Sequence, residues 1–283
     1  MKKITRRSFM AAAGLTVAAL ALTACGGSSS TASSAAASSV ASSAAASSEA
    51  ASAAATELTT VEAGKLTMAT NAAFPPYEMT TDAGEFEGID IETAQAIADK
   101  LGLELQIDDM DFDAALLSVQ QGKADIVMAG VTVTDERKAV MDFSDSYATG
   151  IQSIIVPEGS DIASPDDLAG KKIGTQRGTT GYIYCTDDFG EDAVVAYDSG
   201  LTAVQALNNG QVDAVVIDNA PAKEFVAANP GLVILDTSYA EEDYAIGMNK
   251  SNTALLEAVN AALEELKADG TLQAIVDKYI TAE

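Results

Sequence analysis

From Lys65 to the C-terminus, short apolar segments alternate with segments whose apolar residues recur at helical spacing. This alternation is typical of α/β proteins, in which helices connect the strands of a sheet. Residues 125–128 (DIVM), which lie between Gly122 and Gly130, are apolar after the first residue and rich in β-branched side chains. Such a segment predicts a parallel strand that is buried on both faces. The sequence therefore predicts an α/β fold.

Capping residues indicate where the helices begin and end. We expect Asp90 to cap one helix and Gly102 to stop it. Thr134 is expected to begin another, because a hydroxyl N-cap is followed by Asp135 and Glu136 in the first turn. The expected strands are residues 66–70, 103–107, 125–128, 152–156, 171–175, 193–197, 212–217, 232–236 and 244–248, and further helices are expected at 112–121, 164–170, 201–209, 221–228, 253–268 and 271–280.

Two passages of the chain share one construction. Residues 120–130 (QQGKADIVMAG) and 208–218 (NNGQVDAVVID) each run from a helix end through a glycine and a polar residue into an apolar strand led by aspartate. Glycine often ends a helix that precedes a strand, so each passage is common by itself. Together they indicate two lobes of similar construction that face each other.

The end of the strand at residues 125–128 leads into a group of polar side chains. Thr132 and Thr134 alternate with valines, and Arg137 lies in the first turn of the helix that Thr134 begins. Backbone N–H groups, hydroxyls and one guanidinium at a strand end make a suitable receptor for a carboxylate. The alternative is a surface Arg137 that pairs with Asp135 or Glu136.

The charge balance is strongly acidic. The chain has 16 Lys and Arg against 42 Asp and Glu, a net charge of −26; without residues 1–24, which hold four basic residues and no acid, the balance is 12 against 42, or −30. Such a charge repels phosphate backbones, so no nucleic-acid partner is expected. The chain has no histidine, so we predict no catalytic triad, metal site or cofactor.

The N-terminus has the pattern of an export signal. Four basic residues within positions 2–7 precede an apolar stretch at 9–24, which is shorter than the roughly 20 residues of a spanning helix. Residues 22–25 (LTAC) look like a lipobox, which implies that Cys25 becomes a lipidated N-terminus. Residues 5–9 (TRRSF) also resemble a twin-arginine signal. Cys185 is then expected to be a buried structural thiol.

A serine- and alanine-rich tract follows Cys25. Residues 26–56 contain one acid, Glu49, and cannot bury a core, so residues 25–60 are predicted to be the lipidated cysteine and a disordered tether. As a flexible chain, such a tract has a root-mean-square span of about 30 Å. We therefore expect a globular body held near a membrane by lipid, with no further membrane-spanning segment.

Residues 130–144 (GVTVTDERKAVMDFS) closely resemble the signature segment of the amino-acid-binding proteins of ABC importers, the polar amino acid group of bacterial extracellular solute-binding proteins, family 3. The resemblance extends over about residues 65–280. It implies a two-lobed, type II periplasmic-binding-protein-like fold in which each lobe is a mainly parallel sheet flanked by helices. In that family the chain crosses between lobes twice, here near residues 149–153 and 244–247. Lobe 1 is then residues 61–150 plus 247–283, and lobe 2 is residues 151–246.

The resemblance also implies ligand-binding residues. Gly130, Thr132 and Arg137 match the positions that hold the α-carboxylate of an amino acid, and Asp218 matches the acid that binds its ammonium. Asp218 also follows the end of the expected strand at 212–217, where α/β proteins bind ligands. The alternative for Asp218 is an N-cap of the helix that begins near Pro221.

Five further positions match ligand contacts or selectivity positions of the family. Phe74 and Phe112 match stacking aromatics, although each is also a plausible core residue. Gln176 and Thr180 match contacts from the second lobe, where Thr179 or Thr180 is expected to cap a helix. Asn71 stands where relatives that take cationic amino acids often have an acid, or else it is a turn residue.

These features predict an extracytoplasmic, lipid-anchored, monomeric binding protein rather than an enzyme. It is expected to capture a polar or neutral L-amino acid in the cleft between its lobes, to close by a hinge motion and to deliver the ligand to the permease of an ABC transporter. Two alternatives remain open. One is a secreted enzyme similar to cyclohexadienyl or arogenate dehydratases, and the other is a ligand-sensing module.

Overall fold

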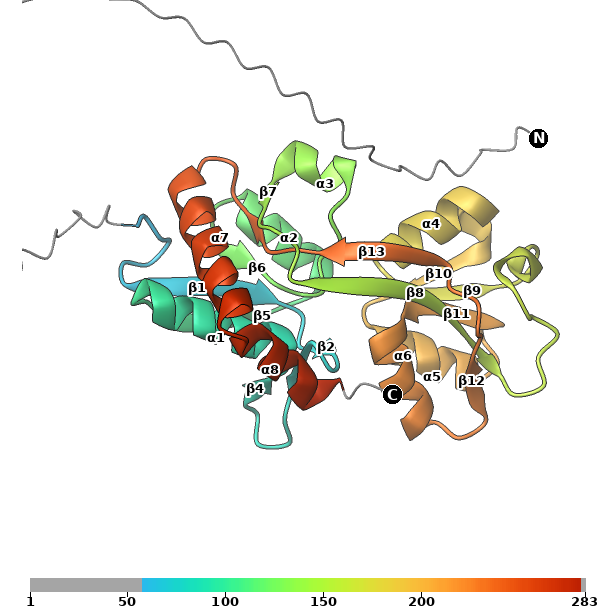
Figure 1. Ribbon diagram of the computed structural model, residues 1–283. Helices are drawn as coiled ribbons and strands as arrows, with labels where there is room; N and C mark the ends of the chain where they lie inside the picture. The colour runs from blue at the N-terminus through green and yellow to red at the C-terminus, as the bar shows by residue number, and fades with distance from the viewer. Residues whose placement is uncertain (1–57, 281–283) are drawn as a thin grey trace, which may run out of the picture. The chain divides into compact units, whose positions relative to one another are not determined.

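The computed structural model describes residues 58–280, which lie in one compact unit. Its strands form two main sheets and one small sheet (Figure 1). The expectations for the signal sequence, Cys25 and most of the tether concern residues outside this range. Within residues 58–280, no helix has the length and apolar character needed to cross a membrane.

The first sheet has the strand order β5-β1-β6-β14-β7. Strand β1 (Lys65–Thr70) pairs in parallel with β5 (Glu104–Asp109) and β6 (Ile126–Val127), whereas β14 (Gly247–Met248) runs antiparallel to β6 and β7 (Asp142–Phe143). Beside it lies a small antiparallel sheet of β2 (Ala73–Phe74), β3 (Glu78–Thr80) and β4 (Phe86–Glu87).

Helices cover both faces of the first sheet, so that β1 and β6 are buried on both sides. One face packs against α1 (Ile89–Leu101), α7 (Thr253–Ala268) and α8 (Thr271–Tyr279), and the other packs against α2 (Phe112–Gln120). The short helix α3 (Asp135–Val140) packs near β7. We call this sheet, the small sheet and these five helices the first lobe.

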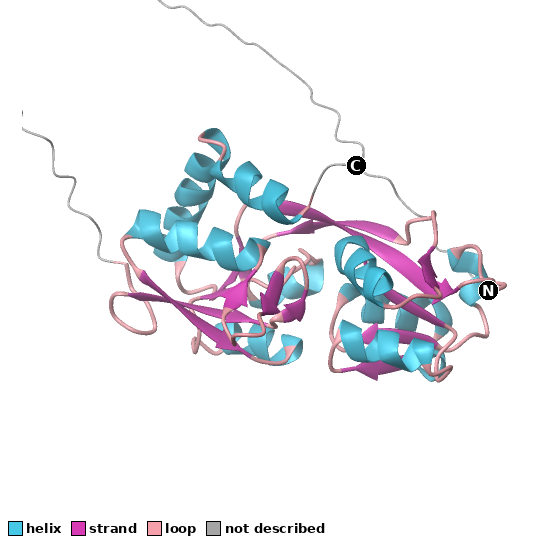
Figure 2. Ribbon diagram, turned by 90° about the horizontal axis from the view of Figure 1, so that it is seen from below, coloured by secondary structure: helices cyan, strands magenta, loops and turns pink. Residues whose placement is uncertain are grey.

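The second sheet has the path β10-β9-β11-β8-β12, with β13 also paired to β8. Strands β9 (Ile173–Gln176), β10 (Val194–Tyr197) and β11 (Ala214–Asp218) are parallel, whereas β8 (Ala148–Pro157), β12 (Leu232–Ile234) and β13 (Ala240–Tyr244) make antiparallel pairs. One face packs against α4 (Thr180–Phe189), and the other against α5 (Gly200–Asn208) and α6 (Asn219–Ala228) (Figure 2). This sheet and α4–α6 form the second lobe.

The chain passes from the first sheet to the second between β7 and β8, and it returns between β13 and β14 (Figure 1). Strands β8 and β13 of the second sheet pair antiparallel from Ala148 to Gln152, side by side, next to the two crossings. These connections make both sheets mixed, whereas mainly parallel sheets were expected. The reason is that β8 and β14 each begin at a crossing and run away from it, whereas β1, β6, β9 and β11 run toward the cavity and end there. The exact lobe boundaries stay a prediction.

Most helices and strands lie within a few residues of their expected positions, but Asp90 differs. The N-cap of α1 is Gly88, and Asp90 lies inside the first turn with its side chain fully buried. Its carboxylate accepts hydrogen bonds from the Gly130 N–H (2.9 Å) and the Tyr147 hydroxyl (2.8 Å). The prediction of a capping Asp90 is therefore wrong, because its carboxylate accepts hydrogen bonds from residues outside the helix. Gly102 does end α1, in the left-handed conformation.

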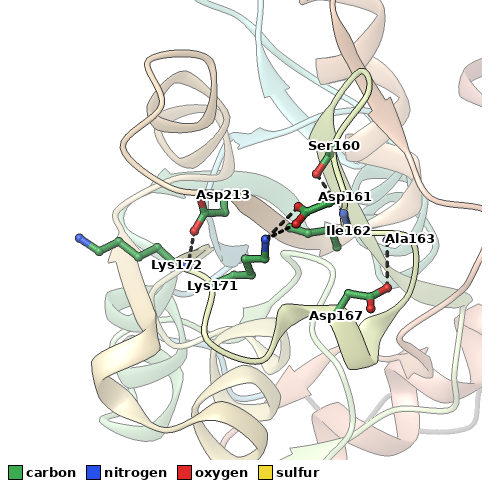
Figure 3. Close-up of polar contacts among 8 residues, drawn as sticks. All are labelled: Ser160, Asp161, Ile162, Ala163, Asp167, Lys171, Lys172 and Asp213. Carbon is green, nitrogen blue, oxygen red and sulfur yellow. Dashed lines mark hydrogen bonds and ion pairs between the residues drawn. The ribbon is translucent and has the colours of Figure 1, made fainter.

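The connection between β8 and β9 lies on the surface of the second lobe, away from the cavity described below. It contains the 3-10 helix η1 (Pro165–Leu168), and Lys171 donates to both oxygens of Asp161, at 2.8 and 2.9 Å (Figure 3). The Lys172 N–H donates to Asp213 (2.7 Å). These side chains are exposed, so the ion pair contributes little to stability.

Candidate functional site

A cavity between the two lobes is lined by all nine residues that the sequence singled out as ligand-binding candidates. The first lobe contributes residues from the ends of β1 and β6, from the small sheet, and from the start of α2 and α3. The second lobe contributes residues from the ends of β9 and β11 and the start of α4. The nine are Asn71, Phe74, Phe112, Gly130, Thr132, Arg137, Gln176, Thr180 and Asp218.

Arg137 is buried, with 7% of its surface exposed. Thr134 caps α3 by accepting the Arg137 backbone N–H (3.2 Å), which places Arg137 in the first turn as expected. The guanidinium donates to the carbonyl oxygens of Thr132 (2.8 Å) and Gly178 (3.1 Å), and it lies 5.4 Å from the centre of the Phe112 ring. The alternative of a surface Arg137 is therefore wrong.

Asp218 ends β11 and is 5% exposed. It occupies the N-cap position of α6, but its side chain makes no capping hydrogen bond; instead it accepts from Gln152 Nε2 (2.6 Å). Burial raises the pKa of Asp218 to about 7, against the opposing effect of the nearby Tyr244 hydroxyl. A carboxylate in this setting is stabilised by any cation that enters the cavity.

Two glycines allow close approach around the cavity. Gly130 has a φ of 55°, and an added Cβ would lie 2.9 Å from the Phe74 ring. At Gly150 an added Cβ would lie 2.6 Å from both Asp218 Oδ1 and the Tyr244 ring. Only glycine fits these positions without displacing a side chain of the site.

Direct contacts between the lobes surround the cavity. Gln176 Nε2 donates to Asn71 Oδ1 (2.9 Å), the hydroxyls of Thr132 and Thr180 are 3.4 Å apart, and Arg137 reaches Gly178 of the second lobe. Asn71 is therefore more than a turn residue. Its own amide also donates to the Met110 carbonyl (2.9 Å).

The aromatic candidates are both core and cavity residues. Phe74 belongs to the larger hydrophobic core and Phe112 to the core beneath α2, yet each also lines the cavity.

On the second lobe, Thr179 caps α4 by accepting the Tyr182 N–H (3.3 Å). Arg177 is exposed, and its Nε lies 3.8 Å from Asp198 Oδ1, as expected for a surface cation. Cys185 is buried, as predicted.

Three polar residues of the site were not predicted from the sequence. Glu78 and Gln152 line the cavity, and Glu242 lies behind it, 6% exposed, accepting from the Thr132 hydroxyl (3.1 Å) and Gln152 Nε2 (3.0 Å). Glu78 is fully buried, and neither of its oxygens makes a hydrogen bond of ordinary geometry to a described residue. Burial raises the pKa of Glu78 well above its usual range, and the neighbouring Asp90 raises it further.

No group of three metal-ligating side chains suitable for a metal ion occurs among residues 58–280. What the cavity offers is one buried guanidinium, two buried carboxyl groups and aromatic walls. Burying either charge of a small zwitterion without a partner costs several kcal/mol, of order 3 to 5. This arrangement can satisfy both charges of such a molecule.

Comparisons with known proteins agree with this geometry. Residues 66–282 match the family model of bacterial extracellular solute-binding proteins, family 3. The L-cystine-binding protein TcyJ of Escherichia coli (strain K12) is 34% identical over 226 residues, which cover 78% of this chain and 85% of that protein. The probable histidine-binding protein of Neisseria gonorrhoeae is 32% identical over 279 residues, covering 96% and 95%.

Solved structures are similar as well. An ancestral arginine-binding protein bound to arginine is 43% identical, with a TM-score of 0.73, and the match covers 77% of this chain and 98% of that one. The arginine-, lysine-, histidine-binding protein ArtJ from Geobacillus stearothermophilus is 33% identical, with a TM-score of 0.74, and the match covers 77% and 96%. These matches confirm the predicted type II periplasmic-binding-protein-like fold, and the relatives are binding proteins rather than enzymes.

Proposed function

Because the chain belongs to the bacterial extracellular solute-binding proteins of family 3, we propose that it captures an L-amino acid between its lobes and delivers it to an ABC transporter permease. The observation that carries the proposal is the pair of buried, opposite charges, Arg137 and Asp218, that line one cavity from different lobes. The α-carboxylate pairs with Arg137 and the α-ammonium with Asp218. Only the closed arrangement satisfies both charges, so binding favours closure.

The contacts of Gly130 refine its proposed role. Its N–H already donates to Asp90, so this peptide offers the ligand its carbonyl oxygen rather than its N–H. A carbonyl oxygen accepts hydrogen bonds and suits an ammonium better than a carboxylate. We therefore place Gly130 beside the ammonium and leave the carboxylate to Thr132, Thr180 and Arg137.

Glu78 indicates which class of side chain the ligand carries. The sequence favoured a polar or neutral amino acid, in part because Asn71 is not acidic. Glu78 supplies a second buried carboxylate to the cavity beyond the one that the ammonium needs. A cationic side chain compensates the cost of burying it. Within the polar amino acids we therefore propose the cationic ones as the best fit, as in the relatives named for arginine and histidine.

We also propose that the protein is an extracytoplasmic lipoprotein. This rests on the sequence of residues 1–24 and on Cys25, followed by the serine- and alanine-rich tract. One lipid anchor and a monomeric body that reaches the membrane through this tract fit delivery to a membrane permease. Metabolic labelling with a fatty acid, with and without Cys25→Ser, tests the anchor.

A thermal-shift panel of the L-amino acids, followed by calorimetry, tests the proposed ligand. We expect the largest stabilisation from a cationic amino acid. Replacing Glu78 with glutamine should weaken binding of L-arginine by about tenfold, since it removes a charged hydrogen-bond partner worth roughly 1.5 kcal/mol, but should barely affect L-glutamine. The exposed Glu85→Gln is the matched control. Failure of every L-amino acid to bind would refute the proposed function.

A further inference from the structure

Gln152 lies at the centre of the strands that connect the lobes. In β8 it pairs with Asp218 of β11 on one side and with Ala240 of β13 on the other. Its side chain is 2% exposed and lines the cavity. One atom, Nε2, donates to Asp218 Oδ2 (2.6 Å) and to Glu242 Oε2 (3.0 Å). Gln152 therefore joins two buried carboxylates through a single amide group.

The orientation of the amide follows from its neighbours. The NH2 group has two N–H bonds, one for each carboxylate, whereas the reversed amide would place Oε1 against two negative oxygens. Oε1 itself is buried without a partner among the described residues. Both donors of Gln152 are thus committed to Asp218 and Glu242.

The two carboxylates lie close together but face different groups. Asp218 lines the cavity, whereas Glu242 lies behind it and accepts from Thr132. Burial lowers the pKa of Arg137, and among the charged groups that oppose this effect Glu242 is the strongest. Glu242 thus balances the guanidinium, while Asp218 is left for the ligand.

We propose that Gln152 is a positioning residue that holds Asp218 and Glu242 in place together. Asp218 then keeps a negative charge directed at the ligand, while the charge of Glu242 attracts Arg137. This deepens the proposed amino-acid binding and rests on it for the identity of the ligand. The geometry that carries the inference is the bridge itself, two hydrogen bonds that one buried amide donates to two carboxylates where the strands cross between the lobes.

The surroundings of Asp218 show why the bridge matters. Burial raises the pKa of Asp218, and the charge of Glu242 raises it further, whereas donors from Tyr244 and Gln152 lower it. From the small-sheet side of the cavity, Tyr77 and Glu78 also face Asp218; burial raises the pKa of both, and a negative Asp218 raises it further. With so many acidic neighbours, loss of the Gln152 donor favours a neutral Asp218.

The surroundings of Glu242 complete the set of groups. Arg137 of α3 attracts it, and Tyr184 of α4 faces it, with the pKa of Tyr184 raised by burial first and by Glu242 next. Tyr244 of β13 also lies near Glu242. Burial raises the pKa of Tyr244, and the charge of Glu242 raises it further. Among these groups Arg137 is the cation, so Arg137 opposes the negative charge of Glu242.

Gln152→Leu, which keeps the size of the side chain and removes its donors, tests the proposal on ligand-free protein. Carbon-13 NMR of the Asp218 carboxyl, assigned with Asp218→Asn, should show a titration midpoint about one pH unit higher than in the wild type. The exposed Gln205→Leu is the matched control and should leave the midpoint unchanged. An unchanged midpoint in Gln152→Leu would overturn the proposal, whatever the ligand.

Binding of L-arginine provides the second readout. Near pH 7, Gln152→Leu should bind about tenfold more weakly than the wild type, with a smaller loss near pH 8.5 because Asp218 is again ionised there. Adding Glu242→Gln removes the repelling charge, so the double variant should titrate at lower pH than Gln152→Leu. A loss of affinity that does not vary with pH, as a purely structural role gives, would contradict the proposal. Wild-type protein that binds no amino acid would refute the proposed function instead, and the NMR titration would still decide the role of Gln152.

Discussion

At one end of the cavity Arg137 is fixed by backbone carbonyl oxygens of Thr132 and Gly178, whereas at the other end Asp218 is fixed by the side chain of Gln152. The first end therefore depends on the path of the main chain and on one charged residue. The second end depends on a group of side chains whose charges affect one another. We expect the first end to fail when its one residue is replaced, and the second to respond to several substitutions and to pH.

The largest expected effect is at the Arg137 end. Replacing Arg137 with alanine leaves the ligand carboxylate buried without a cation, which costs about 3 to 5 kcal/mol, or roughly two to four orders of magnitude in affinity. Calorimetry with L-arginine measures the change. The exposed Arg177→Ala is the control and should bind within about twofold of the wild type, since exposed ion pairs are worth little. If Arg137→Ala lowered the affinity less than fivefold, Arg137 would not be a ligand-binding residue.

A smaller loss is expected at the Asp218 end. Asp218→Asn keeps the shape and removes one charge, and because Glu242 still supplies negative potential, we expect a loss of about 2 to 3 kcal/mol in binding. The exposed Asp187→Asn serves as the control by the same calorimetric measurement. If Asp218→Asn cost as much as Arg137→Ala, both ends would depend on one charge each, and the contrast between them would be lost.

The difference between the two ends also decides how much of the site the sequence could predict. The Arg137 end is local: strand end, threonine cap and first helical turn follow one another between residues 126 and 137, and the structure has them as expected. Asp218 follows a strand with an evident pattern, but its position also fitted a helix N-cap, and the resemblance to the family decided between the two. The helices and strands were predictable for the same reason, since periodicity and caps are local signals.

The residues that support Asp218 leave no such local signal. Gln152 lies in a strand, Glu242 lies in an acidic stretch that resembles a solvated surface, and Glu78 begins the short strand β3 in a stretch where the sequence predicts a loop. Each becomes part of the site only when β8, β13 and the small sheet pack against each other. Asp90 shows the converse: it has the local pattern of a capping residue, but its carboxylate accepts hydrogen bonds from two residues distant in sequence, Gly130 and Tyr147.

The carboxylate end should also make the stability of the ligand-free protein depend on pH. Burial raises the pKa of Asp218 to about 7 and of Asp90 to about 6, so between about pH 4 and pH 7 the folded protein binds more protons than the unfolded chain. The contribution of these two groups to the free energy of unfolding therefore falls as the pH rises through this window.

Each pKa unit corresponds to about 1.4 kcal/mol, so we expect Asp218 alone to contribute roughly 2 kcal/mol to this fall. Chemical denaturation of the wild type and Asp218→Asn near pH 5 and pH 8 measures it, because the variant lacks the titrating group. Equal pH dependence in the two proteins would show that Asp218 is already compensated without a ligand.

The smallest expected effect tests whether the Arg137 end depends on the main chain, as the contacts indicate. Thr134→Ala removes the cap of α3 and should lower the free energy of unfolding by about 1 kcal/mol. L-arginine affinity should fall by less than about threefold, because the guanidinium is held by the Thr132 and Gly178 carbonyls and not by the cap. Thr134→Ser keeps the hydroxyl and is the matched control. A loss of affinity close to that of Arg137→Ala would mean that the start of α3, rather than the two carbonyl groups, sets the position of the guanidinium.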